Sequence, residues 1–198
     1  MIQTSSSVSK VLGALLIGIG LLVFIVRLFH DGPYAMPQGG GLWGGLGAIA
    51  LGAVLVSASR FIPLGLIALV ISPVALFPAL YSIMGEAEEV ISLYAKSADG
   101  ETVDLRLWIV DREDGAWVGM GREKAVSNNL DGAQLEMLRG GELSCVVPVL
   151  HEDRPTARAI HAMKVDKYWV AQSFGALGLY PLEATESTVV LRLDPCEG

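Results

Sequence analysis

Residues Val11–Val26 read VLGALLIGIGLLVFIV, an unbroken run of apolar side chains that decides how the chain is solvated. Leu28 and Phe29 extend this run beyond Arg27, to about 19 residues. At about 1.5 Å rise per residue, a helix of that length crosses a hydrocarbon layer about 30 Å thick. The run is longer than the apolar core of a signal peptide, and no convincing small-x-small cleavage site follows it. We therefore expect a retained membrane-spanning helix over residues 11–29.

Two more apolar stretches follow, at residues 39–59 and 61–84, and only a short link with Arg60 separates them. So short a link predicts a tight antiparallel helical hairpin with Arg60 at the membrane interface. No charged side chain lies deep within a predicted span, although transporters and proton relays usually need one. We interpret residues 1–84 as an anchor with three transmembrane helices, whose partner is the lipid bilayer.

Small residues recur at helical spacing in the second span. Gly41 and Gly45 lie four residues apart, a pattern that allows two helix backbones to approach closely. The neighbouring helix belongs either to the same chain or to a second copy, so a homodimer through this Gly41/Gly45 face stays open.

Charge divides the chain sharply. Residues 1–84 hold three basic and one acidic side chain, net +2, whereas residues 85–198 hold eleven basic and twenty acidic, net −9. This split predicts a membrane domain and a water-soluble domain with those boundaries. An acidic domain without Lys/Arg clusters is a poor partner for nucleic acid. The positive-inside rule weakly favours an integral protein of the cell (inner) membrane with its soluble domain in the cytoplasm.

The sequence contains few residues of the kinds that bind metals or form disulfides, three histidines and two cysteines. The three histidines, His30, His151 and His161, show no metal-ligand spacing, so no metal site is predicted. Cys145 and Cys196 could pair, but buried free thiols are commoner in a chain with so few cysteines. We expect free thiols.

From Val90 onward the apolar pattern has a period of two, which predicts strands. The expected strands cover residues 90–96, 103–110, 116–120, 134–138, 143–149 and 189–193. The inward faces are predicted to be Val103, Leu105, Leu107 and Ile109 in the second strand, Leu143, Cys145, Val147 and Val149 in the fifth, and Val189, Leu191 and Leu193 in the last.

Residues 155–176 show helical spacing instead, with Pro155 placed at a helix start. Six short strands with one helical insertion before the last predict an α+β fold, a small closed or half-closed barrel. Closure would also remove exposed strand edges.

Several segments of this domain, taken in order, resemble one known family. They are LRLWIVDREDGAWVGMGREK (Leu105–Lys124), QLEMLRGGELSCVVPV (Gln134–Val149), AMKVDKYW (Ala162–Trp169) and VVLRLDP (Val189–Pro195). Their order and spacing over about residues 102–195 resemble the deazaflavin-dependent nitroreductase family. That family shares the split β-barrel of FMN-binding proteins and pyridoxamine-phosphate oxidase.

The resemblance implies a reductase or redox module that holds FMN or a deazaflavin against the barrel, often as a homodimer. The positions that match the cofactor-binding residues of the family are Trp117, Gly119, Gly121, Arg122, Lys124, Lys167 and Tyr168. Arginine and lysine suit a phosphate, and glycine lets the backbone approach it. The membrane anchor suggests a hydrophobic, quinone-like acceptor, although the sequence does not identify a substrate.

Structural interpretations compete with these roles. Trp117 could be core packing, Arg122 and Lys124 a solvated turn, and Tyr168-Trp169 a contact with lipid headgroups. No Ser/His/Asp or Cys/His arrangement is visible, so any redox chemistry would belong to the cofactor. The alternative function is a non-enzymatic, membrane-tethered split-barrel module that has lost its cofactor.

Overall fold

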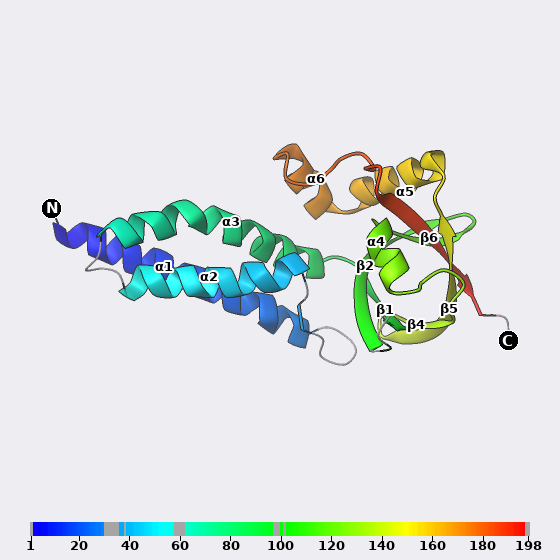
Figure 1. Cartoon of the computed structure of the whole chain (residues 1–198), viewed down its shortest axis with the longest axis horizontal. Coiled ribbons are helices and arrows are strands. Elements are labelled where there is room, and N and C mark those ends of the chain that lie inside the picture. The colour runs from blue at the N-terminus through cyan, green and yellow to red at the C-terminus, as the bar shows by residue number, and fades with distance from the viewer. Residues whose placement is uncertain are drawn as a thin grey trace. The chain divides into compact units, whose positions relative to one another are not determined.

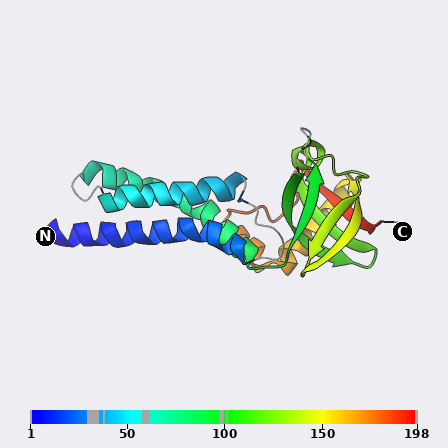
Figure 2. The ribbon, with the colours of Figure 1, turned by 90° about the horizontal axis from the view of Figure 1, so that it is seen from below.

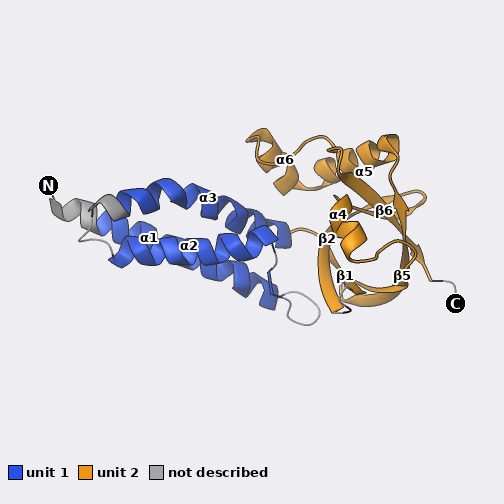
Figure 3. Cartoon of the chain, viewed as in Figure 1, with its two compact units in different colours: residues 1–87 blue, residues 88–198 orange. Residues whose placement is uncertain are grey.

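The computed structural model describes residues 2–29, 36–37, 39–57, 62–96, 100 and 102–196. The chain divides into two compact units, residues 1–87 and residues 88–198 (Figure 3). The link that contains Arg60, between the second and third predicted spans, lies outside the described residues.

The first unit consists of long apolar helices (Figure 1). Helix α1 covers Ile2–Ile25 and continues into the short 3-10 helix η1 at Val26–Leu28, α2 covers Gly39–Ser57 and α3 covers Ile62–Glu86. Within the described residues, three segments are long and apolar enough to cross a membrane: Ser7–Leu28, Gly39–Ser57 and Gly65–Glu86. They agree closely with the spans expected from the sequence.

The glycines of α2 serve packing inside the chain. A Cβ added at Gly45 would lie 3.3 Å from the Gly20 carbonyl oxygen of α1, and one at Gly41 would lie 2.8 Å from Ser82 Oγ of α3. Both positions face another helix of the same chain. The small residues of α2 therefore let α1 and α3 of this chain approach it closely. A homodimer through this face stays a prediction.

The second unit is a closed β-barrel with short helices inserted between its strands (Figures 1 and 2). Its strands are β1 (Val90–Lys96), β2 (Thr102–Arg112), β3 (Gly115–Gly121), β4 (Leu135–Arg139), β5 (Glu142–His151) and β6 (Thr188–Pro195). They close in the order β1-β2-β3-β6-β5-β4, and each neighbouring pair is antiparallel. The predicted α+β barrel is confirmed.

The helices of this unit are α4 (Arg122–Ser127), α5 (Arg154–Lys167) and α6 (Trp169–Ala176). Asp153 caps α5, because its Oδ1 accepts a hydrogen bond of 2.9 Å from the Thr156 amide, and a proline occupies the first turn. The helical segment predicted over residues 155–176 is therefore two helices, interrupted at Tyr168. The period of the sequence does not indicate α4.

Two apolar cores use opposite faces of the same strands. Inside the barrel, alternate strand residues pack together, and they include the predicted inward residues of β2 and β6. Outside it, α5 covers β2, β3 and β6, and α6 contributes Ala171, in a second cluster of Val110, Trp117, Ala157, Ile160, Tyr168, Ala171 and Val190. The outer cluster, defined by these residues, fixes both helices to the barrel.

The inward face predicted for β5 is wrong. Val146 is buried in the barrel interior and Leu150 packs against it, whereas Leu143 is exposed. Leu143, Cys145, Val147 and Val149 therefore lie on the outer face of the strand. Both faces of β5 carry apolar side chains, so a period of two alone does not say which face is inside.

The expectation of free thiols is also wrong, because Cys145 and Cys196 form a disulfide. The pairing of Val146 with Pro195 brings the neighbouring cysteines together, with their Cα atoms 5.4 Å apart. The two residues are 51 positions apart in sequence, so the link arises from the β5–β6 register.

Removing this disulfide should destabilise the barrel. Loop-closure entropy for a separation of 51 residues predicts that Cys145→Ser lowers the free energy of unfolding by about 4 kcal/mol. Urea unfolding of the full chain in mild detergent, followed by tryptophan fluorescence, measures it. The exposed neighbour Ser144, changed to Ala, is the control. Equal midpoints for Cys145→Ser and the wild type would contradict a stabilising link.

Candidate functional site

The residues matched to the cofactor site fall into separate places. Trp117 is buried in the outer cluster, and its Nε1 donates a 3.0 Å hydrogen bond to Asp114 Oδ1. Gly121 precedes α4, on which Lys124 lies and whose first residue, Arg122, forms an ion pair with Glu152. The structure thus brings Gly121, Arg122 and Lys124 together at the carboxyl end of β3, apart from Trp117.

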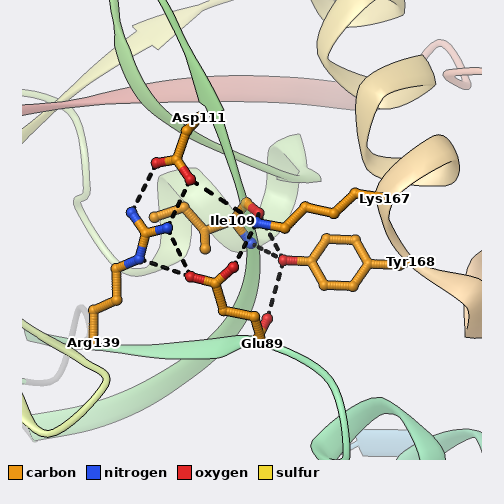
Figure 4. Close-up of polar contacts among 6 residues, drawn as sticks. All are labelled: Glu89, Ile109, Asp111, Arg139, Lys167 and Tyr168. Atoms are coloured by element: carbon orange, nitrogen blue, oxygen red, sulfur yellow. Dashed lines mark hydrogen bonds and ion pairs between the residues drawn. The ribbon is translucent and has the colours of Figure 1, made fainter.

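Tyr168 lies in the outer cluster with Trp117, and its hydroxyl group is fully engaged with the main chain (Figure 4). The hydroxyl accepts a hydrogen bond of 2.9 Å from the Ile109 amide, donates to the Ile109 carbonyl oxygen at 2.6 Å, and lies 3.0 Å from the Glu89 carbonyl oxygen. The ring stacks on Trp108, with 4.8 Å between ring centroids. Burial raises the pKa of the Tyr168 hydroxyl. Tyr168 therefore anchors the junction of α5 and α6 to β2.

Lys167 belongs to a charged network beside this tyrosine (Figure 4). Its Nζ donates to Glu89 Oε2 and, at 2.8 Å, to the Ile109 carbonyl oxygen. Arg139 joins the same network, because its guanidinium group binds Asp111 through two hydrogen bonds of 2.8 and 2.7 Å and Glu89 through one of 2.8 Å. Four elements meet here: the chain entering β1, the end of β2, the end of β4 and the end of α5.

Electrostatics of the network favour its charged forms. The Arg139 hydrogen bonds hold the pKa of Asp111 below its usual value. Burial acts to raise the pKa of Glu89, but the hydrogen bonds and charges of Lys167 and Arg139 outweigh it, so that this pKa is lowered as well. Bidentate pairs of this kind give geometric specificity. The sequence did not indicate Glu89, Asp111 or Arg139, because they are far apart along the chain.

A different cluster lies between α5 and the segment after α6. Lys164 Nζ lies 3.7 Å from the position that a Cβ on Gly119 would occupy, and 5.8 Å from the centre of the Tyr180 ring. No described residue forms a hydrogen bond or an ion pair with this ammonium group. Desolvation lowers the pKa of Lys164 to about 8. The cation is thus available to an anion, and the missing side chain of Gly119 leaves room beside it.

His161 completes this Lys164 cluster, which consists of Gly119, His161, Lys164 and Tyr180. The His161 Nε2 donates to the Pro181 carbonyl oxygen at 2.9 Å, while its buried Nδ1 has no hydrogen-bond partner among the described residues. Its ring stacks on Tyr180, with centroids 5.9 Å apart. Burial lowers the pKa of His161, which keeps the ring neutral and Nδ1 an acceptor.

An anionic cofactor fits this cluster in part. Lys164 supplies a point charge for a phosphate and Gly119 supplies space, whereas the unpartnered His161 Nδ1 is an acceptor and suits a donor group of a ligand rather than its phosphate. Trp117 and Tyr168 do not offer a ring face to a ligand, because both are buried in the outer cluster. Of the positions matched by sequence, Gly119 is the one that the structure places against an uncommitted cation.

No protein-family profile matches the chain, and no curated protein matches it in sequence. Several solved structures are similar to part of it. HutZ, the heme storage protein from Vibrio cholerae, has a TM-score of 0.40 and 13% identity, covering 58% of this chain and 87% of its own. A candidate pyridoxamine 5'-phosphate oxidase from Listeria innocua has a TM-score of 0.37 and 15% identity, over 58% and 89%.

ChuZ from Campylobacter jejuni has a TM-score of 0.38 and 13% identity, covering 70% of this chain and 61% of its own. Similarity at this level identifies no ligand or activity of this chain.

The charged network should stabilise the barrel only where its carboxylates are ionised. In the folded protein the pKa values of Glu89 and Asp111 lie below the ordinary 4.5 and 3.8. The stability that the network contributes is therefore complete at pH values above 4.5. It is lost as the pH falls through the lowered pKa values of the folded state. Because the groups are partly exposed, Arg139→Met should lower the free energy of unfolding by roughly 1 kcal/mol at pH 7.

Urea unfolding at a series of pH values checks this. The difference between Arg139→Met and the wild type should shrink as the solution is acidified. Arg158→Met is the charge-matched control, because Arg158 is exposed on α5. Equal unfolding midpoints for the two variants at pH 7 would contradict a stabilising role of the network.

Proposed function

We propose that this chain is a membrane-anchored, reductase-like protein whose barrel binds an anionic redox cofactor, FMN or a deazaflavin. One observation carries the proposal: the Lys164 ammonium group, partly removed from water, lies beside Gly119 without an anionic partner among the described residues. Gly119 is also one of the positions that resemble the cofactor site of the nitroreductase family.

The physical argument is that a desolvated cation gains from a bound anion. Removing an ammonium group from water disfavours its charge, as the lowered pKa of Lys164 indicates. A cofactor phosphate would restore a favourable charge interaction, and the space above Gly119 would admit one of its oxygen atoms. A bound flavin or deazaflavin would supply hydride transfer, while these residues bind and orient it.

The other matched residues have supporting roles in the proposal. Gly121, Arg122 and Lys124 would offer further backbone and cationic contacts at the start of α4. Trp117, Tyr168 and Lys167 would act indirectly, because they fix α5 and thereby Lys164 against the barrel.

The membrane helices would keep the barrel beside a hydrophobic, quinone-like acceptor dissolved in the bilayer. For a reductase we propose the inner membrane, with the barrel in the cytoplasm, where reduced nicotinamide and flavin are available. We also propose a homodimer through the barrel, as the resemblance implies.

A second candidate function is favoured by the disulfide. The Cys145–Cys196 bond is of a kind that persists in oxidising compartments and is rare in the cytosol. A barrel on the outer side of the membrane would lack reduced nicotinamide, and would instead be a tethered, non-enzymatic interaction module. The burial of Trp117 and Tyr168 agrees with this candidate as well.

Cofactor titration separates the two candidates. The full chain in lipid nanodiscs should bind FMN or a deazaflavin at micromolar concentration, detected by absorption and fluorescence. Lys164→Met should weaken binding at least about tenfold, the effect of losing a charged hydrogen bond. Affinity should also fall as pH rises through about 8, because the free Lys164 then loses its proton.

Lys96→Met, at the exposed end of β1, is the matched control and should bind like the wild type. If neither cofactor binds, the reductase proposal is wrong and the interaction module stands. If a cofactor binds but Lys164→Met has no effect, the site is not the Lys164 cluster, and Arg122→Ala and Lys124→Ala become the next variants.

A further inference from the structure

Residues 168–182 contain no charged side chain, which makes them the longest uncharged stretch of the second unit. They comprise the junction residue Tyr168, helix α6 and the segment that follows it, and they are bounded by Lys167 and Glu183. A stretch of this composition is unusual in a domain that is otherwise rich in acidic residues.

Much of this stretch is apolar and exposed to water. The exposed fractions are 49% for Trp169, 71% for Leu177, 50% for Leu179 and 50% for Leu182. We name these four residues the apolar patch. The patch is held in shape, because a Cβ at Gly175 would collide with the Leu182 side chain, so that the segment folds back onto α6. Exposed apolar groups gathered in one segment mark an interaction surface.

The start of α6 is tied to the point where the chain leaves the third predicted span. The Glu88 carboxylate accepts a 3.3 Å hydrogen bond from the Val170 amide, and the Tyr168 hydroxyl lies 3.0 Å from the Glu89 carbonyl oxygen (Figure 4). Helix α3 ends at Glu86, only two residues before Glu88. Since each residue spans at most about 3.6 Å, the two-residue link from Glu86 to Glu88 limits how far the start of α6 can lie from the end of α3, whatever the orientation of the two units.

We propose that the apolar patch inserts into the interface of the bilayer that the three helices span. This inference rests on the membrane anchoring proposed above. Tryptophan and leucine are favoured at the boundary between headgroups and acyl chains, and this stretch has no charge to dehydrate. Proximity to the membrane exit favours the bilayer over a second copy of the chain as the partner.

Docking of the patch would also bring the candidate cofactor site to the membrane. Tyr180 and Pro181 lie between Leu179 and Leu182, and they contact Lys164 and His161 of the Lys164 cluster. An acceptor dissolved in the bilayer would then reach this cluster without crossing water. The patch therefore offers a physical reason for fusing the barrel to membrane helices.

Site-specific labelling of the full chain tests the inference. A single cysteine at Leu179→Cys would carry an environment-sensitive NBD label, since the native cysteines are joined in a disulfide. In phosphatidylcholine vesicles, the NBD emission at position 179 should lie to the blue of the emission from a water-exposed label. Lipids that carry a doxyl group should quench it. Labels at Val126→Cys and Leu143→Cys, which are 63% and 59% exposed, are matched controls and should show neither effect.

A label at Val70→Cys, within the third predicted span on α3, reports on the anchor separately. Quenching at Val70 without quenching at Leu179 would overturn the inference and leave the anchor intact. Quenching at neither position would overturn the membrane anchor as well. A blue shift at Leu179 that doxyl lipids do not quench would mean that a second copy covers the patch, and this too would overturn the inference.

Discussion

The hydrogen bonds between the Tyr168 hydroxyl and the Ile109 main chain are the contact on which the second unit depends. Tyr168 lies between α5 and α6, and these bonds tie the junction of the two helices to β2. With this junction in place, Lys167 reaches Glu89, and the first amide groups of α6 reach Glu88. Lys164, one turn earlier on α5, is thereby held against Gly119 of β3. Lys167 of the charged network, the start of the apolar patch and Lys164 thus all lie within four residues of this junction.

The strands can support this arrangement because they are apolar on both faces. One face fills the barrel and the other receives α5 and α6 through the outer cluster. The charged groups are placed at the end of the barrel, where Arg139 and Lys167 satisfy two carboxylates near solvent. The cation of Lys164 is different, because it lies between helix and barrel without a counter-charge from the described residues. This contrast distinguishes the charged network, whose groups satisfy one another, from the Lys164 cluster, for which we propose a bound anion.

The sequence pattern was enough to predict the long apolar helices and the strands, because each depends on neighbours in sequence, and the number of strands indicated the α+β barrel. The sequence pattern did not predict features that depend on pairing between distant segments. These features are the inward face of β5, the Cys145–Cys196 bond and the charged network. The resemblance pointed to Lys167 and Tyr168, whose polar groups bond Glu89 and Ile109 of the same unit. It did not point to Lys164. A signal was available, since Lys164 follows the buried Ile160 by four residues and so lies on the covered side of α5.

The ionisation of Lys164 in the full chain is the most direct test of the proposed anion site. Competitive acylation, followed by mass spectrometry of the peptides across a pH series, gives the apparent pKa of each lysine. We predict a pKa of about 8 for Lys164 and a rise of this pKa when FMN or a deazaflavin is added, with no effect of the cofactor on Lys96. A pKa near the ordinary 10.5, or one that saturating cofactor leaves unchanged, would contradict the assignment of this lysine to an anion site.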